Sequence, residues 1–266
     1  MKIGFIGTGN MGGALARAAA KGGHTLLLAN RTPAKAEALA KELGGTVCPN
    51  AQAAETAELL FLGVKPQGLP GLAGELAPVL QARKGNAPVV VSMATAVTLR
   101  ELDAMLGGGL PLIRIMPNTP AAVGAGTILY AAQNVTDAQL NAFRAVLAQA
   151  GLLLPLPEAQ IDAASAISGC GPAFCFQFTD ALALGGVRAG LSYPDACRLA
   201  AQTMLGAAEM LLQGGEAPDV LKMRVCSPAG TTIEGVLALE QGGFSYTVQN
   251  AVTAAYRRTV EMTKKG

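Results

Sequence analysis

The chain has 266 residues, of which 50 are alanine and 33 are glycine, and it carries a formal net charge of +2 with 14% charged residues. Apolar residues make up 51% of the sequence, which is enough for a buried core and excludes intrinsic disorder. The single histidine and the lack of any basic run longer than two residues argue against a zinc enzyme, a hydrolase with a histidine base and a nucleic-acid-binding protein.

The five cysteines are odd in number and form no CxxC pair, so we expect neither a disulfide framework nor a metal site. We expect them to be small buried side chains. The N-terminus lacks the pattern of a signal peptide, and the uncharged residues 163–179 are too few and too polar to span a bilayer. These features predict a cytoplasmic protein that binds neither membranes nor nucleic acid.

Up to about residue 155, short apolar runs alternate with amphipathic segments. The candidate strands are Lys2–Gly7, Thr25–Ala29, Leu59–Val64, Val89–Met93, Pro111–Met116, Thr127–Ala131 and Leu152–Leu156, and clear helices include Met11–Lys21, Pro33–Leu43 and Leu99–Leu106. Wholly apolar strands separated by helices indicate a parallel sheet covered on both faces. The pattern predicts an α/β fold, in which residues 1–156 form a Rossmann-type doubly wound domain with a mostly parallel sheet.

From Glu158 onward the sequence shows only helical periodicity. The candidate helices are Ala159–Ala166, Pro172–Gly185, Pro194–Leu212, Pro228–Leu239 and Tyr246–Lys264. These helices predict an all-helical C-terminal domain over residues 157–266. Its many small residues allow close helix packing, and its apolar content predicts a homodimer that completes the core of this domain.

Residues 7–12 form the pattern GxGxxG between a candidate strand and a candidate helix. In such a loop the first glycine permits the tight turn, the second lets a pyrophosphate approach the backbone, and the third allows helix and strand to pack closely. The phosphates then lie at the N-terminus of the helix. We therefore predict a dinucleotide site that includes Gly7, Thr8, Gly9, Asn10, Met11 and Gly12.

The second candidate strand ends at Asn30-Arg31-Thr32, without the carboxylate that binds the ribose of NAD. A guanidinium and a hydroxyl can instead bind the 2′-phosphate of NADP. We therefore predict NADP, with NADPH preferred over NADH, bound by Asn30, Arg31 and Thr32. The alternative is that Arg31 and Thr32 only begin the next helix, because a threonine before a proline is a favourable helix start.

Further strand ends contribute polar turns to the same edge of the sheet, where ligands bind in open α/β folds. They add the remaining candidates for cofactor binding, which are Asn50, Val64, Lys65, Pro66, Ala94, Thr95, Met116, Pro117 and Asn118. We expect three of these turns, at residues 64–66, 94–95 and 116–118, to lie on the nicotinamide side of the cofactor.

In the helical part, residues 225–233 place three hydroxyl groups and a glycine around a candidate helix start. A helix N-terminus with such neighbours can bind a carboxylate through backbone N–H groups. We predict substrate binding by Ser227, Gly230, Thr231 and Thr232. The alternative is that Ser227 is simply an N-cap.

Five segments together resemble the Δ1-pyrroline-5-carboxylate reductase family. They are Ile6-Gly-Thr-Gly-Asn-Met-Gly12, Val64-Lys-Pro-Gln67, Arg114-Ile-Met-Pro-Asn-Thr-Pro120, Ser168-Gly-Cys-Gly-Pro-Ala-Phe174 and Cys226-Ser-Pro-Ala-Gly-Thr-Thr-Ile233. The last segment departs from the family, which usually has Gly-Gly where this chain has Ala229-Gly230. Helical dihedral angles at Ala229 would make the change harmless, whereas a positive φ would disturb the loop.

The resemblance implies reduction of the cyclic imine pyrroline-5-carboxylate to L-proline with NAD(P)H, the last step of proline biosynthesis. It also implies a helical domain that intertwines into a dimer, which can assemble further into a ring. The substrate carboxylate would be held by Ser227 and the N–H groups around Gly230, Thr231 and Thr232. The Thr232 hydroxyl, the predicted catalytic group, would hydrogen-bond the ring nitrogen.

Three alternatives have the same dinucleotide loop. A β-hydroxyacid dehydrogenase needs a lysine in its helical domain, but no lysine occurs between Lys84 and Lys222. The others are a coenzyme-type NADP oxidoreductase and a non-enzymatic NADP sensor. The sensor would not need the hydroxyl cluster at residues 227–232.

Overall fold

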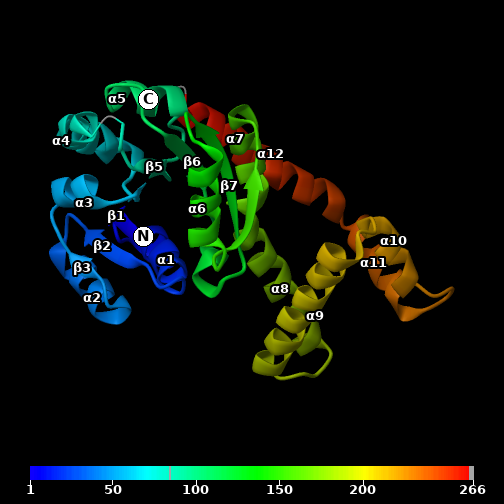
Figure 1. Ribbon diagram of the computed structural model, residues 1–266. Helices are drawn as coiled ribbons and strands as arrows, with labels where there is room; N and C mark the ends of the chain where they lie inside the picture. The colour runs from blue at the N-terminus through cyan, green and yellow to red at the C-terminus, as the bar shows by residue number, and fades with distance from the viewer. Residues whose placement is uncertain (84, 264–266) are drawn as a thin grey trace. The chain divides into compact units, whose positions relative to one another are not determined.

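The computed structural model describes residues 1–83 and 85–263 (Figure 1). By its internal contacts the chain divides into two compact units. The first is Met1–Cys170 together with the chain from Ala255 on, and the second is Gly171–Ala254. This division follows contacts, whereas the domain boundary at residue 156 follows the change in sequence pattern, and that boundary stays a prediction.

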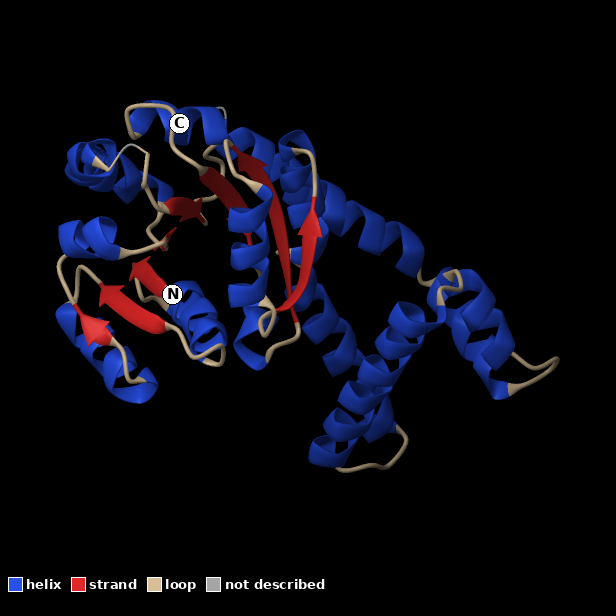
Figure 2. Cartoon of the chain, viewed as in Figure 1, coloured by secondary structure: helices blue, strands red, loops and turns tan. Residues whose placement is uncertain are grey.

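The first unit contains an eight-stranded sheet with the order β3-β2-β1-β4-β5-β6-β7-β8 (Figure 2). Its strands are β1 Lys2–Ile6, β2 Thr25–Ala29, β3 Thr46–Val47, β4 Leu59–Leu62, β5 Val89–Ser92, β6 Leu112–Met116, β7 Gly126–Gln133 and β8 Gly151–Pro155. Its helices are α1 Asn10–Ala20, α2 Pro33–Leu43, α3 Asn50–Thr56, α4 Leu69–Ala82, α5 Leu99–Met105, α6 Asp137–Leu147 and α7 Glu158–Ser168, with 3-10 helices η1 Pro66–Gly68 and η2 Thr119–Val123.

Strands β1 to β6 are parallel, but β7 pairs antiparallel with β6, and β8 then pairs parallel with β7. The two last strands were expected in a parallel sheet, so their direction differs from the expectation. The reason lies in the connection, because only the short η2 follows β6 and a parallel return needs a longer crossover. The predicted fold class, a doubly wound and mostly parallel sheet followed by helices, is confirmed.

Two apolar clusters cover the two faces of the sheet. On one face α1, α2 and α6 pack through residues such as Leu15, Leu39 and Phe143. On the other face α3, α4, α5 and α7 pack through residues such as Leu76 and Ile161. Because strand residues alternate between these clusters, the wholly apolar strands are explained by burial on both sides.

The strand order reverses at β1, which lies between β2 and β4. At the carboxyl ends of β1 and β4 the backbones of Gly7 and Gly63 touch, and a Cβ on Gly7 would lie 2.5 Å from the carbonyl oxygen of Gly63. Gly7 also has a φ of 99°, which favours glycine. This reversal is the position at which open α/β sheets bind their ligands.

The second unit is helical, with α8 Gly171–Arg188, α9 Tyr193–Gly214, α10 Pro218–Val225 and α11 Thr231–Gln241. Helix α12, Phe244–Thr263, begins in this unit and ends in the first. Two expectations for this part were wrong: α10 was not predicted, and α11 begins at Thr231 rather than at Pro228. The predicted end of the last helix at Lys264 lies outside the described residues.

The second unit has little core of its own. Its buried cluster consists of Ala183, Ala196 and Ala200. In contrast Phe176, Leu212 and Tyr246 are 69%, 81% and 71% exposed. Apolar exposure on this scale marks an interaction surface. Within the described part of the chain, no helix is long and apolar enough to cross a bilayer.

From the contact between Gly7 and Gly63 we predict that a side chain at Gly63 lowers the stability of the fold. In Gly63→Ala the new methyl group would collide with the backbone carbonyl of Gly7, so we expect the free energy of unfolding to fall by about 1–3 kcal/mol. The control is Gly71→Ala in α4, where a Cβ meets nothing within 4 Å and a gain of about 0.5–1 kcal/mol is expected. Urea unfolding measures both, and equal effects would contradict the contact.

Candidate cofactor and substrate sites

The carboxyl ends of β1, β2, β4, β5 and β6 lie at one edge of the sheet because these strands are parallel neighbours. All the predicted cofactor residues come from this edge. Gly7–Gly12 follow β1, Asn30–Thr32 follow β2, Val64–Pro66 follow β4, Ala94 and Thr95 follow β5, and Pro117 and Asn118 follow Met116 at the end of β6, while Asn50 opens α3. The structure therefore brings together residues that are up to 111 positions apart.

The three glycines of the GxGxxG loop differ in the space around them. Gly7 is fixed by its contact with Gly63, and a Cβ on Gly12 would collide with the carbonyl oxygen of Gly7. A Cβ on Gly9 would meet no protein atom within 4 Å, so this glycine leaves room for a ligand. The loop leads into α1, whose first turn has neither a side-chain cap nor an acidic residue. This arrangement suits a pyrophosphate.

Thr8 supports the same interpretation. Its side chain is 7% exposed, and its hydroxyl oxygen has no hydrogen-bond partner among the described residues. A buried hydroxyl without a partner costs free energy, so a ligand oxygen at this loop would satisfy it. Residues 7–12 therefore fit the phosphates of a dinucleotide in both shape and hydrogen bonding.

Asn30 joins the ends of β1 and β2. Its Oδ1 accepts the N–H of Thr8 at 3.0 Å, and its Nδ2 donates to the carbonyl oxygen of Thr32 at 3.0 Å. It also lines a cleft of about 460 Å³ together with Asn50 and Glu75, and Asn50 donates to Glu75 at 3.0 Å. Asn30 therefore shapes the loop, and the cleft beside it can hold a flat group such as an adenine.

Arg31 and Thr32 are exposed beyond the end of β2. Thr32 is the N-cap residue of α2, but its side chain makes no capping hydrogen bond. The helix start of the alternative is therefore present, with Thr32 as N-cap residue and a proline as the first residue of α2, but the Thr32 hydroxyl makes no capping bond and is available to a ligand. Sequence reasoning did not include Lys35, the third residue of α2, which lines a second cleft, of about 250 Å³, with Thr8 and Gly9. Its place in the first turn of the helix that follows Arg31 was the available signal.

The same cleft contains an ion pair between Arg17 and Glu42, so the charge of Arg17 is already neutralised. Arg17 binds both carboxylate oxygens of Glu42, with distances of 2.6 and 2.7 Å. The hydrogen bond from Arg17 lowers the pKa of Glu42 below its usual value. Because Arg17 is already paired with Glu42, Lys35 is the lining cation of this cleft that has no ion pair among the described residues, and the exposed Arg31 precedes the same helix, α2.

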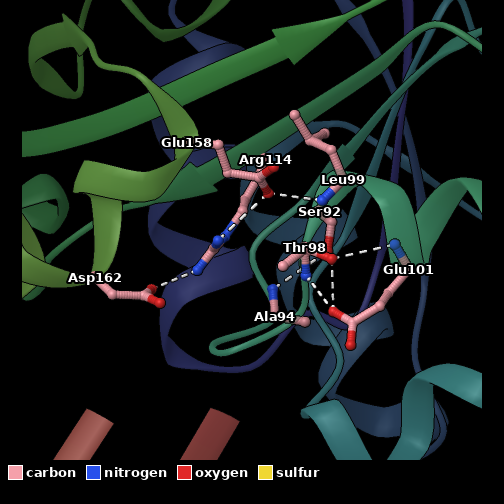
Figure 3. Close-up of polar contacts among 8 residues, drawn as sticks. All are labelled: Ser92, Ala94, Thr98, Leu99, Glu101, Arg114, Glu158 and Asp162. Atoms are coloured by element: carbon pink, nitrogen blue, oxygen red, sulfur yellow. Dashed lines mark hydrogen bonds and ion pairs between the residues drawn. The ribbon is translucent and has the colours of Figure 1, made fainter. Parts of the chain in front are cut away.

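Hydrogen bonds hold both ends of the turn after β5. The Ser92 hydroxyl accepts the N–H of Ala94 at 3.3 Å, and Thr98 forms a capping box with Glu101 at the start of α5 (Figure 3). Hydrogen bonds from the backbone and then the side chain of Thr98 lower the pKa of Glu101. Between these ends Ala96 has a φ of 62°, a strained conformation for a residue with a Cβ.

In the turns after β4 and β6, one polar side chain is exposed and the other is buried and hydrogen-bonded. Lys65 is exposed at the end of β4 and precedes η1. Asn118 is 7% exposed, and its amide accepts the N–H of Thr127 at 2.8 Å and donates to the carbonyl oxygen of Ser168 at 2.9 Å. The side chain of Asn118 therefore shapes the turn, and its contact with a cofactor stays a prediction.

In the second unit, residues 227–230 form a turn in which the N–H of Gly230 donates to the carbonyl oxygen of Ser227 at 3.0 Å. Ala229, the third residue of this turn, has a φ of 56°. A helix cannot continue through this conformation, which explains why α11 begins only at Thr231. Ser227 is consequently not the N-cap of α11, and the capping alternative for it is wrong.

The N-terminus of α11 is open. Gly230 is its N-cap residue and makes no side-chain cap, so the first N–H groups of the helix face outward together with the exposed hydroxyls of Thr231 and Thr232. A Cβ on Gly230 would collide with the Ser227 hydroxyl, so glycine keeps this hydroxyl beside the turn. The arrangement can bind a carboxylate.

The cysteines were expected to be buried, which holds for Cys48 alone. Burial raises the pKa of the Cys48 thiol, whereas Cys175 is exposed and the other three are partly exposed. Among residues 1–83 and 85–263, no group of three or more potential ligands could hold a metal ion.

Two family models match this chain. The pyrroline-5-carboxylate reductase dimerisation model matches residues 158–262, and the model of NADP oxidoreductases dependent on coenzyme F420 matches residues 2–96. The first segment begins two residues after the predicted domain boundary. The second covers the glycine-rich loop and strands β1 to β5, and it ends before β6.

Full-length relatives extend both matches. The chain is 39% identical to pyrroline-5-carboxylate reductase of a Synechocystis species, covering 100% of this chain and 99% of the relative. It is 35% identical to pyrroline-5-carboxylate reductase 3 of Macaca fascicularis, covering 99% and 97%. Among solved structures, pyrroline carboxylate reductase of Plasmodium falciparum with NADP bound has a TM-score of 0.86 at 30% identity, covering 99% of both chains. The reductase of Coxiella burnetii has a TM-score of 0.89 at 32% identity, covering 97% of both chains.

From the positive φ of Ala229 we predict that glycine at this position stabilises the protein. Glycine is less strained in this conformation, but it also gains freedom in the unfolded chain, so Ala229→Gly should raise the free energy of unfolding by up to about 1 kcal/mol. The control Ala238→Gly, inside α11, should lower it by about 1 kcal/mol. Denaturant titration distinguishes the two signs, and a loss in both variants would contradict the strain at Ala229.

Proposed function

The chain belongs to the pyrroline-5-carboxylate reductase family, so its reaction is the reduction of 1-pyrroline-5-carboxylate to L-proline in proline biosynthesis, and we propose how its residues perform it. Relatives match over the whole chain, which excludes the alternatives of a β-hydroxyacid dehydrogenase, a coenzyme-type oxidoreductase and a non-enzymatic sensor.

NADP is the cofactor, and its reduced form supplies a hydride when bound. Gly9 and the N-terminus of α1 would hold the pyrophosphate, with the Thr8 hydroxyl as a further donor. Arg31, Thr32 and Lys35 would bind the 2′-phosphate. The observation that supports the preference for NADPH over NADH is that the turn after β2 carries the exposed Arg31 and Thr32 and has no carboxylate at its end.

The turns after β4, β5 and β6 would line the nicotinamide end of the cofactor. The bond from Ala94 to Ser92 and the capping box at Thr98 hold the turn after β5. The two hydrogen bonds of Asn118 hold the turn after β6. Rigid turns keep the hydride donor in one position, which is how a protein with few ionisable groups at its site can accelerate hydride transfer.

The open N-terminus of α11 would bind the substrate carboxylate. The N–H groups of Thr231 and Thr232 and the Ser227 hydroxyl supply donors without a formal charge. The Thr232 hydroxyl would hydrogen-bond the ring nitrogen of the imine. Hydride addition to the imine carbon reduces the C=N bond, and the nitrogen keeps the proton of the iminium form, so no strong general acid is needed.

The dimerisation match and the exposed apolar residues of the second unit indicate a homodimer. We extend this proposal to a larger ring built from dimers, as the family resemblance implies. We also place the enzyme in the cytoplasm, because its five cysteines are free and Cys175 is exposed, which suits a reducing compartment.

The 2′-phosphate proposal predicts a change in cofactor preference. Arg31→Ala should raise KM for NADPH by about 10-fold or more, because a charge-assisted hydrogen bond contributes about 1.5–3 kcal/mol. KM for NADH should change less than about twofold, and Lys35→Ala should show the same selectivity with a smaller effect. Arg100→Ala, an exposed arginine on α5, is the control. Equal losses for both cofactors in Arg31→Ala would remove Arg31 from the phosphate site.

The reaction itself is tested by mixing the protein with NADPH and pyrroline-5-carboxylate and following the loss of NADPH absorbance. In Thr232→Ala we expect kcat/KM to fall by about 10-fold or more, since about 1.4 kcal/mol corresponds to one decade. Thr232→Ser should retain most of the activity because it keeps the hydroxyl. The control Thr203→Ala removes a hydroxyl that bonds only to the carbonyl of Leu199 within α9. An unchanged rate in Thr232→Ala would exclude its role.

A further inference from the structure

We propose that Glu158 is a positioning residue for the cofactor, which holds the turn between β5 and α5 in place from a distant segment of the chain. The proposal rests on the placement of Ala94 and Thr95 beside the nicotinamide end. It goes beyond that placement because Glu158 itself lies at the start of α7, outside the turns that face the cofactor.

The proposal is based on a hydrogen bond between residues that are far apart in the sequence. The Glu158 Oε1 accepts the N–H of Leu99, the first residue of α5, at 2.6 Å, across 59 residues (Figure 3). The capping box of α5 already satisfies two other N–H groups, those of Thr98 and Glu101. Glu158 therefore adds a third capping bond that comes from another helix rather than from the local sequence.

Arg114 holds Glu158 in this position. The Arg114 side chain, in the middle of β6, is 3% exposed and its two terminal nitrogens pair with Glu158 at 3.4 Å and with Asp162 at 2.5 Å. A buried guanidinium is costly unless its partners are well placed, so the two carboxylates are fixed relative to β6. The start of α5 is thereby tied to β6 through Glu158.

The other end of the same turn is tied to β5. Ser92 is the register partner of Arg114 on the adjacent strand, and its hydroxyl accepts the N–H of Ala94. The strained Ala96 lies between these two attachments, and strain of this kind persists only where the surroundings determine the backbone conformation. Ser92 and Glu158 supply that constraint at the two ends of the turn.

A role in stability alone would make a different prediction. If Glu158 only stabilises the fold, its loss should lower Tm and leave the affinity for every part of the cofactor unchanged well below Tm. If it positions the turn after β5, its loss should weaken NADPH binding but spare adenosine 2′,5′-bisphosphate, which lacks the nicotinamide. The two ligands therefore separate positioning from stability.

The test is the Kd of each ligand, measured by calorimetry on the full chain. In Glu158→Ala we expect Kd for NADPH to rise about threefold to tenfold while Kd for adenosine 2′,5′-bisphosphate stays within about 1.5-fold. Glu158→Asp, which keeps the charge beside Arg114 but withdraws the oxygen from Leu99, should behave in the same way if Glu158→Ala fails to fold. Glu158→Gln keeps an acceptor oxygen and should restore most of the NADPH affinity.

Two control variants complete the design. Asp162→Ala breaks the other ion pair of Arg114 but leaves the bond from Leu99 to Glu158, so Tm should fall while both affinities are kept. Gln139→Ala removes a capping box of the same kind on α6. That helix follows β7, whose end lies at the opposite edge of the sheet, so the affinities should again be unchanged.

Unchanged NADPH binding in Glu158→Ala or Glu158→Asp, or equal losses for both ligands, would overturn the role of Glu158. A wild-type protein that binds neither ligand would instead overturn the proposed cofactor site. A selective loss of NADPH affinity, restored by Glu158→Gln, supports the role.

Discussion

The close approach of Gly7 and Gly63 determines where this protein can bind a dinucleotide. Their backbones touch where β1 and β4 end, which leaves no space for a side chain on either residue. The contact brings the loop before α1 against the loop after β4, and the third glycine of the pattern, Gly12, packs on Gly7 in the same way. Gly9 is the exception, because the space around it is open. The packed glycines thus place the open one, together with the start of α1, at the edge of the sheet.

Both proposed ligand sites would use the backbone N–H groups at the start of a helix to bind an anionic group. Helices α1 and α11 begin without side-chain caps, and each leaves its first N–H groups open to a ligand. This explains how an enzyme with 14% charged residues and one histidine can bind two anionic ligands. In the proposed cofactor site, Arg31 and Lys35 would supply the formal positive charge that distinguishes NADPH from NADH.

Local sequence was enough to predict which residues lie at the carboxyl edge of the parallel strands, because each strand and its following turn are adjacent in the chain. The GxGxxG pattern and the Asn30-Arg31-Thr32 turn needed only this local order. The direction of β7 could not be deduced in the same way, since it depends on how the short η2 turns the chain. Glu158 was missed for a related reason: its partners Arg114 and Leu99 are 44 and 59 residues away, and spacing alone gives no sign of them. The start of α11 was misplaced because proline after serine is a common helix start, and the positive φ of Ala229 overrides it.

The proposed substrate site lies in a unit that has little core of its own. Its buried cluster consists of three alanines, while large apolar side chains such as Phe176 and Tyr246 remain exposed in the single chain. A helical segment with so small a core gains most of its stability by covering these side chains in the homodimer. The turn at residues 227–232 belongs to this unit, so we expect the same association to stabilise it. The strained Ala229 adds to this dependence, because a backbone conformation that costs free energy is kept only when the surrounding helices are held firmly in place. We therefore expect dimer formation to stabilise the proposed substrate site as well as the helices of the second unit.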